Sequence, residues 1–182
     1  MSKSIRMEGI VELVDFKEAI SNHEIEKTKL RATLAEAHRL KDRSKIHDEL
    51  FSSAAKRYRE FTSIVDDLTN ACLKDGIVTD PNLRKFVFDY IQCDPYFYRS
   101  GYILEKLLQR IKKLKLSTGE KNKIQVLILH RIETRALRNF RNICRLIPVI
   151  SDDDFHQAVL DRYRSKDENV RRRAEFALCY FR

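Results

Sequence analysis

Apolar side chains recur along most of this chain at spacings of three and four residues, which is the period of an amphipathic α-helix. One such stripe follows Asp80-Pro81, a pair that starts helices because Asp caps free amides and Pro needs no donor at the first position. The stripe consists of Leu83, Phe86, Val87, Tyr90 and Ile91. We therefore predict a buried helix over residues 81–91.

Two further helices are expected after it. Asp94-Pro95 repeats the start signal, and the next buried face consists of Ile103, Leu104, Leu107, Leu108, Ile111 and Leu114. Ser117 and Glu120 have the spacing of a capping box, which opens a helix that we expect to run to Ile147, before Pro148. Its apolar stripe consists of Leu129, Ile132, Ala136, Phe140, Ile143 and Ile147.

The N-terminal part is more ambiguous. Residues 7–20 form a helix candidate, and Ser21-Asn22 offers a break and a cap. From there to Gly76 the chain lacks Gly and Pro, so one long helix or two helices joined near residues 42–44 both fit, and two antiparallel helices are favoured. Gly76 is expected to end the second helix in a left-handed conformation.

A heptad seam runs along the second of these N-terminal helices. It consists of Ala54, Tyr58, Phe61, Val65, Leu68 and Cys72. Its apolar side has to be covered. Either the preceding segment covers it, through Leu30, Leu34, Ala37 and Leu40, or a second copy of the chain does so, which would make residues 54–72 a homodimer interface. We favour the intramolecular hairpin.

The C-terminal stretch contains two short helical patterns joined by a polar turn. Phe155, Val159 and Tyr163 line the first, and small residues dominate the face of the second. Asp167, Val170, Arg171, Ala174, Ala177 and Leu178 stand at the positions of the second helix of a HEAT repeat. Residues 152–181 thus resemble one HEAT-like repeat, and this resemblance implies a superhelical stack with a binding surface rather than a particular reaction.

Composition agrees with a helical protein. The 182 residues are 43% hydrophobic and 35% charged, with only four Gly and three Pro, too few for the turns of a β-protein. The predicted fold class is all-α: an N-terminal helical hairpin over residues 1–75, then a HEAT-like α-solenoid stack over residues 76–182. Neither a membrane-spanning run nor a secretory signal is found in the sequence, so we expect a cytoplasmic protein without a membrane partner.

Positive charge is concentrated in the second part of the chain. The net charge is +9, whereas residues 1–75 contain 14 basic and 14 acidic residues. Residues 106–145 contain 12 Lys and Arg against only Glu120 and Glu133. Five arginines would align along one face of the expected 117–147 helix: Arg131, Arg135, Arg138, Arg141 and Arg145. Guanidiniums suit phosphate and carboxylate, so this stripe is either a binding surface for an anionic partner or a solvated face.

An aromatic cluster at the start of the helix after Asp94-Pro95 is the second candidate for binding. It consists of Tyr96, Phe97, Tyr98, Arg99 and Tyr102. Exposed, these side chains would stack on bases or anchor a partner. Buried, they would pack helices together, and we expect at least two of the aromatic residues to be buried.

Signatures of enzymes are missing from the sequence. It has no glycine-rich phosphate loop, no His-Glu-x-x-His and no Gly-x-Ser-x-Gly, and its histidines form no i, i+4 pair that would share a metal ion. Asp152, Asp153 and Asp154 are expected to cap a helix rather than bind a metal. The four widely spaced cysteines, Cys72, Cys93, Cys144 and Cys179, are expected to be buried small hydrophobes rather than disulfides or zinc ligands.

The sequence therefore predicts a non-enzymatic protein-binding module with a basic face, without cofactor or metal. The favoured partner is a protein with an acidic surface. The first alternative is a nucleic acid whose phosphates contact the five arginines, since some proteins of the HEAT-like kind grip duplexes along a concave basic surface. The second alternative is an enzyme with an unrecognised carboxylate site.

Overall fold

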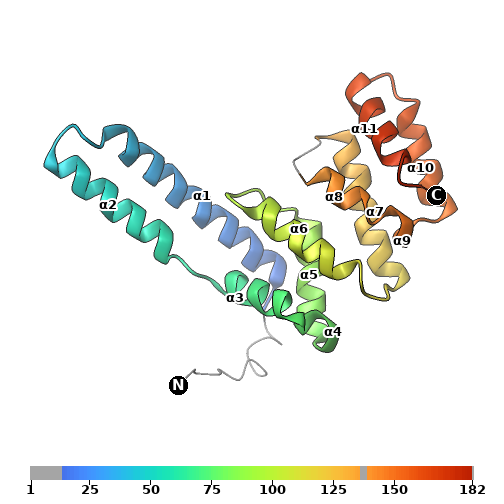
Figure 1. Cartoon of the computed structure of the whole chain (residues 1–182), viewed down its shortest axis with the longest axis horizontal. Helices are drawn as coiled ribbons and strands as arrows, with labels where there is room; N and C mark the ends of the chain where they lie inside the picture. The colour runs from blue at the N-terminus through green and yellow to red at the C-terminus, as the bar shows by residue number, and fades with distance from the viewer. Residues whose placement is uncertain (1–13, 136–138, 182) are drawn as a thin grey trace.

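A computed structural model gives the conformation of residues 14–135 and 139–181. Within these residues the chain is helical, without a strand, which confirms the all-α fold class. Figure 1 shows three successive groups of helices: a hairpin that projects at one end, a central group, and a C-terminal group at the other end.

The hairpin consists of α1 (Phe16–Leu40) and α2 (Lys45–Glu60), which pack against each other and confirm the joint expected near residues 42–44. The break expected at Ser21-Asn22 is wrong. Each Ser or Asn inside a helix lowers helix stability by less than about 1 kcal/mol relative to Ala, so the pair does not by itself end the helix. Ile20 and His23, buried on either side of this point, hold the helix against the core. The start expected near residue 7 lies outside the described residues.

The heptad seam does not lie on one helix. After α2 the chain forms α3 (Ile64–Ala71), the π-helical turn η3 (Cys72–Gly76) and α4 (Ile77–Thr79). Ser63 and Asp66 form a capping box that starts α3, so Ala54 and Tyr58 belong to the hairpin, whereas Val65 and Leu68 belong to the central group. The hairpin is thus intramolecular, and a homodimer through residues 54–72 stays a prediction.

Gly76 is needed for space rather than for a left-handed conformation. Its φ is −60°, which any residue adopts, so the expectation of a left-handed end is wrong. A Cβ atom at this position would lie 2.5 Å from Leu83 Cδ1 and 3.0 Å from the Ala71 carbonyl oxygen. Glycine therefore allows Leu83 of α5 to pack directly against the end of η3.

The central group is arranged around α5 (Pro81–Cys93), which contacts α1, α3, α6 (Ser100–Ile111) and α7 (Thr118–Glu133). All five residues of the stripe predicted for α5 are buried, with Asp80 as its cap. Arg84 of α5 forms a two-point ion pair with Glu120 of α7, at 2.5 Å and 2.8 Å. Glu120 also completes the predicted capping box with Ser117.

The long helix expected from residue 117 to 147 is wrong, because α7 ends at Glu133 and α8 (Phe140–Cys144) follows. Arg173 donates to the carbonyl oxygens of Ile132 and Glu133 at the end of α7, with Nε 2.6 Å from the Ile132 oxygen. A side chain distant in sequence thus provides the C-terminal cap of α7.

The C-terminal group continues with α9 (Ile147–Ile150), α10 (Asp153–Tyr163) and α11 (Glu168–Leu178). The pair α10–α11 packs as predicted through Phe155 and Val159 on one helix and Ala174 and Ala177 on the other, all of which are buried. Tyr163, expected on the same face as Phe155, is instead exposed. Asp152 caps α10 by accepting from the Phe155 amide at 2.8 Å, which confirms its capping role.

A single cluster of buried side chains extends from Phe16 in α1 to Ala177 in α11. It crosses position 75 without interruption, so the boundary between residues 1–75 and 76–182 stays a prediction. Of the helices described here, none combines the length and the apolar character that are needed to cross a membrane.

Replacing Ala174 by leucine tests the packing of α10 on α11. Ala174 is fully buried, so Ala174→Leu should lower the free energy of unfolding by about 1–3 kcal/mol through overpacking. Urea denaturation measures the change, and Glu175→Leu, at an exposed position of the same helix, is the control. Equal stability of the two variants would show that α11 does not pack through Ala174.

Glu120 should make stability depend on pH. Its hydrogen bonds with Arg84 lower the pKa of the carboxyl from 4.5 to about 2, so the ionised form stabilises the fold above pH 4.5, and this contribution is lost as the pH falls toward 2. We expect Glu120→Gln to lower the free energy of unfolding at pH 7 by about 2 kcal/mol. In urea denaturation, the difference in free energy of unfolding between the wild type and Glu120→Gln should decrease between pH 4.5 and pH 3. Glu175→Gln, at an exposed position, should change the free energy of unfolding little at any pH. A difference for Glu120→Gln that does not depend on pH would contradict the assigned role of the Glu120 carboxylate.

Candidate interaction surface

The loop of residues 94–99, between α5 and α6, is fixed at both ends. Asp94 and Arg99 have φ angles of 46° and 72°, in the left-handed region that residues other than glycine seldom adopt. The Tyr96 amide donates to Glu24 Oε1 of α1 at 2.9 Å, and the Phe97 amide donates to Ser100 Oγ at 3.2 Å. Strained residues persist where surrounding contacts determine them, so this loop holds its side chains in defined positions.

The tyrosines of the aromatic cluster point toward solvent. Tyr96, Tyr98 and Tyr102 are 61%, 49% and 48% exposed, so the expectation that at least two of the aromatic residues are buried is wrong. Phe97 is half-buried, with its ring 4.8 Å from the ring of buried His23. Because Phe97 takes the place against α1, the tyrosines on either side of it project outward.

Arg131 does not belong to an exposed stripe. Its side chain is 2% exposed and forms an ion pair with Asp94, so α7 is joined to the start of the 94–99 loop. The expectation that this arginine points outward is wrong, because Asp94, directly after α5, compensates its charge in a buried position. Burial raises the pKa of the Asp94 carboxyl and lowers that of the Arg131 guanidinium, and in each case the partner's charge opposes the shift.

Three of the four other arginines of the expected stripe are described, and they have separate positions. Arg135 is exposed in the segment after α7, and Arg138 lies outside the described residues. Arg141 and Arg145 are exposed, in α8 and directly after it, and Arg145 donates to Asn142 Oδ1. Because α7 ends at Glu133, Arg135, Arg141 and Arg145 do not share one helical face with Arg131.

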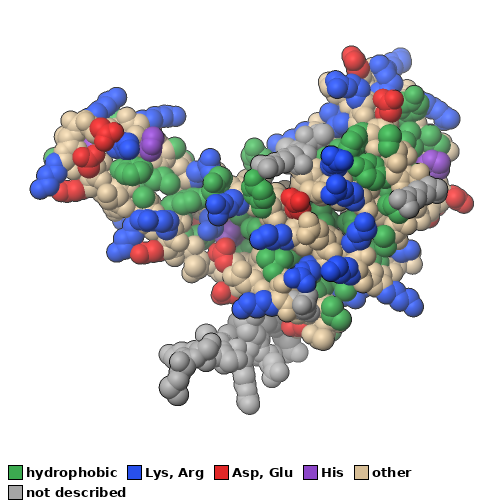
Figure 2. Space-filling view, in the orientation of Figure 1, with side chains coloured by type: hydrophobic (Ala, Val, Ile, Leu, Met, Phe, Trp, Pro, Cys, Tyr) green, Lys and Arg blue, Asp and Glu red, His purple; other side chains and the backbone are tan. Residues whose placement is uncertain are grey.

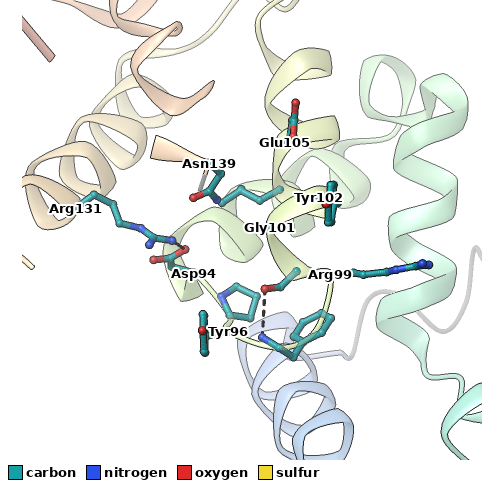
Figure 3. A pocket seen from close by; sticks show the side chains of 12 residues that line it. Asp94, Tyr96, Arg99, Gly101, Tyr102, Glu105, Arg131 and Asn139 are labelled. Atoms are coloured by element: carbon teal, nitrogen blue, oxygen red, sulfur yellow. Dashed lines mark hydrogen bonds and ion pairs between the residues drawn. The ribbon is translucent and has the colours of Figure 1, made fainter. Parts of the chain in front are cut away.

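A cavity of about 250 Å³ brings Arg131 of the predicted stripe together with Tyr96, Arg99 and Tyr102 of the predicted aromatic cluster. Figure 3 shows Arg131 next to Asp94 on one side of it and Arg99 and Tyr102 on the other, with Asn139 and Tyr96 between them. Arg131 Nε, Arg131 Nη1 and Asn139 Oδ1 are buried atoms without a hydrogen-bond partner among the described residues. The lining thus combines these buried polar atoms with the apolar side chains of Pro95, Phe97 and Leu104, beside the exposed tyrosines.

Arginines stack on two of these tyrosines. The Arg135 guanidinium lies over the Tyr96 ring at 4.8 Å, and the Arg31 guanidinium over the Tyr98 ring at 4.3 Å. We define the tyrosine–arginine surface by six residues: Arg31, Tyr96, Tyr98, Arg99, Tyr102 and Arg135. Figure 2 shows the molecule hollowed between the hairpin and the C-terminal helices, with Lys and Arg side chains prominent on that face. A cation–π contact orients the arginine and the tyrosine relative to each other, and an exposed one stabilises the arrangement by about 0.5–1 kcal/mol.

Arg31 was missed by the sequence reasoning. It belongs to the charge-neutral N-terminal half, and no local pattern distinguishes it from its neighbours in α1. The hairpin places it beside Tyr98, which also reaches the ring of Tyr58 in α2 at 6.4 Å between centroids. Only the tertiary arrangement joins α1 to the 94–99 loop.

A groove along one side of the hairpin adjoins this surface. It encloses about 890 Å³ between α1 and α2, and Tyr98 closes the end next to the 94–99 loop. Its apolar lining consists of Leu34, Ala35, Phe51, Ala55 and Tyr58, and its basic lining of Arg31, His38, Arg39 and Arg59. The arrangement offers apolar contact and positive charge together.

The cysteines and the possible metal ligands were the other candidates for reactive or metal-binding sites. Burial raises the pKa of the Cys72 and Cys144 thiols to about 12, which makes both unreactive. Cys93 is half-buried, whereas Cys179 is exposed and departs from the expectation of burial. Across residues 14–135 and 139–181, no three His, Cys, Asp or Glu side chains gather as metal ligands would.

Removing Arg131 should have a much larger effect on stability than removing Arg135. Arg131→Met leaves the Asp94 carboxyl buried without its partner, so we expect a loss of about 3 kcal/mol in the free energy of unfolding. Exposed Arg135→Met should cost less than about 0.5 kcal/mol. Adding Asp94→Asn to Arg131→Met should recover part of the loss. Similar losses for the two single variants, measured by urea denaturation, would contradict the buried pair.

Comparison of the chain with protein-family models, with curated proteins and with solved structures finds no match. The interaction surface is therefore interpreted from its own geometry: exposed tyrosines on a fixed loop, arginines stacked on them, and a groove of mixed apolar and basic character beside it.

Proposed function

We propose that this protein is a non-enzymatic helical module that binds an acidic protein partner through the tyrosine–arginine surface. The observation that carries the proposal is the exposure of Tyr96, Tyr98 and Tyr102 beside arginines on a loop of fixed shape. Tyrosine and arginine are enriched among the residues that dominate protein–protein binding. A loop fixed before binding loses little conformational entropy when a partner docks.

The charges on this surface support an acidic partner. Among the residues described, no carboxylate pairs with Arg31, Arg99 or Arg135. The guanidinium of each lies over a tyrosine ring. The nearby Asp94 is already compensated by Arg131. Three positive charges without carboxylate partners thus remain for a bound anion, and complementary charge increases association rate and specificity.

A nucleic acid is the second candidate, because tyrosines and arginines also stack on exposed bases. Two observations favour the protein partner over it. The five-arginine stripe that would have followed a phosphate backbone does not form, since Arg131 is buried. The Tyr98 ring is already covered by Arg31, so that face is not open to a base.

The proposal includes a cytoplasmic location and a HEAT-like character for the C-terminal pair. Supporting the latter, Asp167 Oδ1 caps α11 by accepting from the Asn169 and Val170 amides, and Val170 and Ala174 are buried against α10. These contacts correspond to the roles that the resemblance implies for the second helix of a repeat.

Charge reversal on this surface tests the proposed function. Proteins captured from nuclease-treated lysate by the wild type should be identified by mass spectrometry and compared with those captured by Arg31→Glu/Arg135→Glu. The control is Arg141→Glu/Arg145→Glu, which changes the net charge equally at residues that line neither the cavity nor the groove. We expect acidic partners to be lost only with the first variant.

Equal capture by both variants would exclude the surface as the binding site. The nucleic-acid alternative is tested with a fluorescent single-stranded oligonucleotide at two salt concentrations. Affinity that falls steeply with salt, and falls further in Arg31→Glu/Arg135→Glu alone, would assign the surface to nucleic acid instead.

A further inference from the structure

We propose that the groove between α1 and α2 binds an acidic amphipathic helix of the partner, which completes a three-helix bundle on the hairpin. This inference rests on the proposed function, because it assigns the partner's secondary structure and the place where that segment docks. The groove is defined by its lining residues given above.

The hairpin is incomplete as a packed unit. From residue 24 to residue 60, only Ala54 is buried, although this stretch contains most of α1 and all of α2. Leu34 and Phe51 are half-buried on the inner faces of the two helices. Amphipathic helices gain most of their stability by burying an apolar face, so a third element along the groove would supply burial that two helices cannot.

The dimensions of the groove suit a short helix. Its lining on α1 extends from Arg31 to Arg39, which is about 12 Å at the rise of 1.5 Å per residue. The lining on α2 extends from Phe51 to Arg59, over an equal number of residues. An occupant of two to three turns would therefore contact both helices, with its apolar residues on Leu34, Ala35 and Ala55.

The charge of the groove specifies the polar face of that occupant. Arg31, Arg39 and Arg59 are the charged side chains that line it, and no acidic residue lines it. Of these three arginines, Arg39 alone has a carboxylate partner within the described part of the chain: Glu36, in an exposed pair at 3.1 Å. Asp or Glu beside the apolar stripe of the docked helix would pair with these arginines.

Two other occupants fit the groove less well. A second copy of this chain, docked groove to groove, would bring like charges together around an apolar centre, which is unfavourable. A nucleic acid would place phosphates over the aliphatic side chains of Leu34, Ala35 and Ala55, which offer it no hydrogen bond. An acidic helix satisfies the apolar floor and the basic rim at once.

The groove continues into the tyrosine–arginine surface. Tyr98 closes the end of the groove, and Arg31 belongs both to its lining and to the stack on Tyr98. A partner whose helix fills the groove would therefore reach Tyr98 with the residues that follow its helix.

A peptide-selection experiment tests this inference. A phage library of random peptides of about 16 residues, roughly four helical turns, is selected on the full-length protein. Peptides enriched on the wild type should carry net negative charge and apolar residues at positions i, i+3, i+4 and i+7. Two substitutions on α1 then locate the site: Ala35→Glu adds bulk and negative charge within the groove, and Thr33→Glu adds negative charge on the opposite face of the hairpin.

Ala35 and Thr33 are both exposed, so neither change should disturb folding. Calorimetric titration of a selected peptide should show at least about tenfold weaker binding to Ala35→Glu, and binding to Thr33→Glu within about twofold of the wild type. No enrichment, enrichment of basic or extended peptides, or equal effects of the two substitutions would overturn the inference. If Arg31→Glu/Arg135→Glu abolishes capture of acidic proteins while Ala35→Glu leaves peptide binding intact, the proposed function stands and the groove is not the site.

Discussion

The buried ion pair between Asp94 and Arg131 is the contact on which the proposed binding surface depends. It joins the end of α5 to the end of α7, and it compensates a carboxylate at the position where the chain turns through a left-handed residue. Buried charges require close partners, so both groups are confined to one arrangement. The 94–99 loop begins at this fixed point. Tyr96 projects from the loop beneath Arg135, which follows α7, and Tyr98 projects beneath Arg31 of α1.

Much of the fold follows from local sequence, and its main departures have tertiary causes. Helix α5 forms where Asp80-Pro81 and an apolar stripe predict it, because cap, proline and burial all favour the same conformation. Helix α7 ends earlier than its periodicity predicts, at the point where Arg173, 41 residues distant from Ile132, donates to the carbonyl oxygens of Ile132 and Glu133. Likewise the Ser21-Asn22 break fails because Ile20 and His23 are buried.

The candidate surface was predictable only in part. The aromatic cluster is recognisable as a stretch of sequence, but its exposure depends on Phe97 packing beside His23 while the tyrosines face outward. The spacing of the arginines indicated one helix face, yet Arg131 is buried in an ion pair with Asp94 of the 94–99 loop. Arg31 gives no local signal, since only the hairpin brings it to Tyr98. Spacing reports which residues share a helix face, not what covers that face.

Amide hydrogen exchange of the protein with and without its captured acidic partner tests the central claim most directly, because it locates the bound surface without any substitution. The account predicts slower exchange in the 94–99 loop and in the parts of α1 and α2 that line the groove, with α10 and α11 unchanged. Protection confined to α8, α10 and α11, with none in the 94–99 loop, would contradict it.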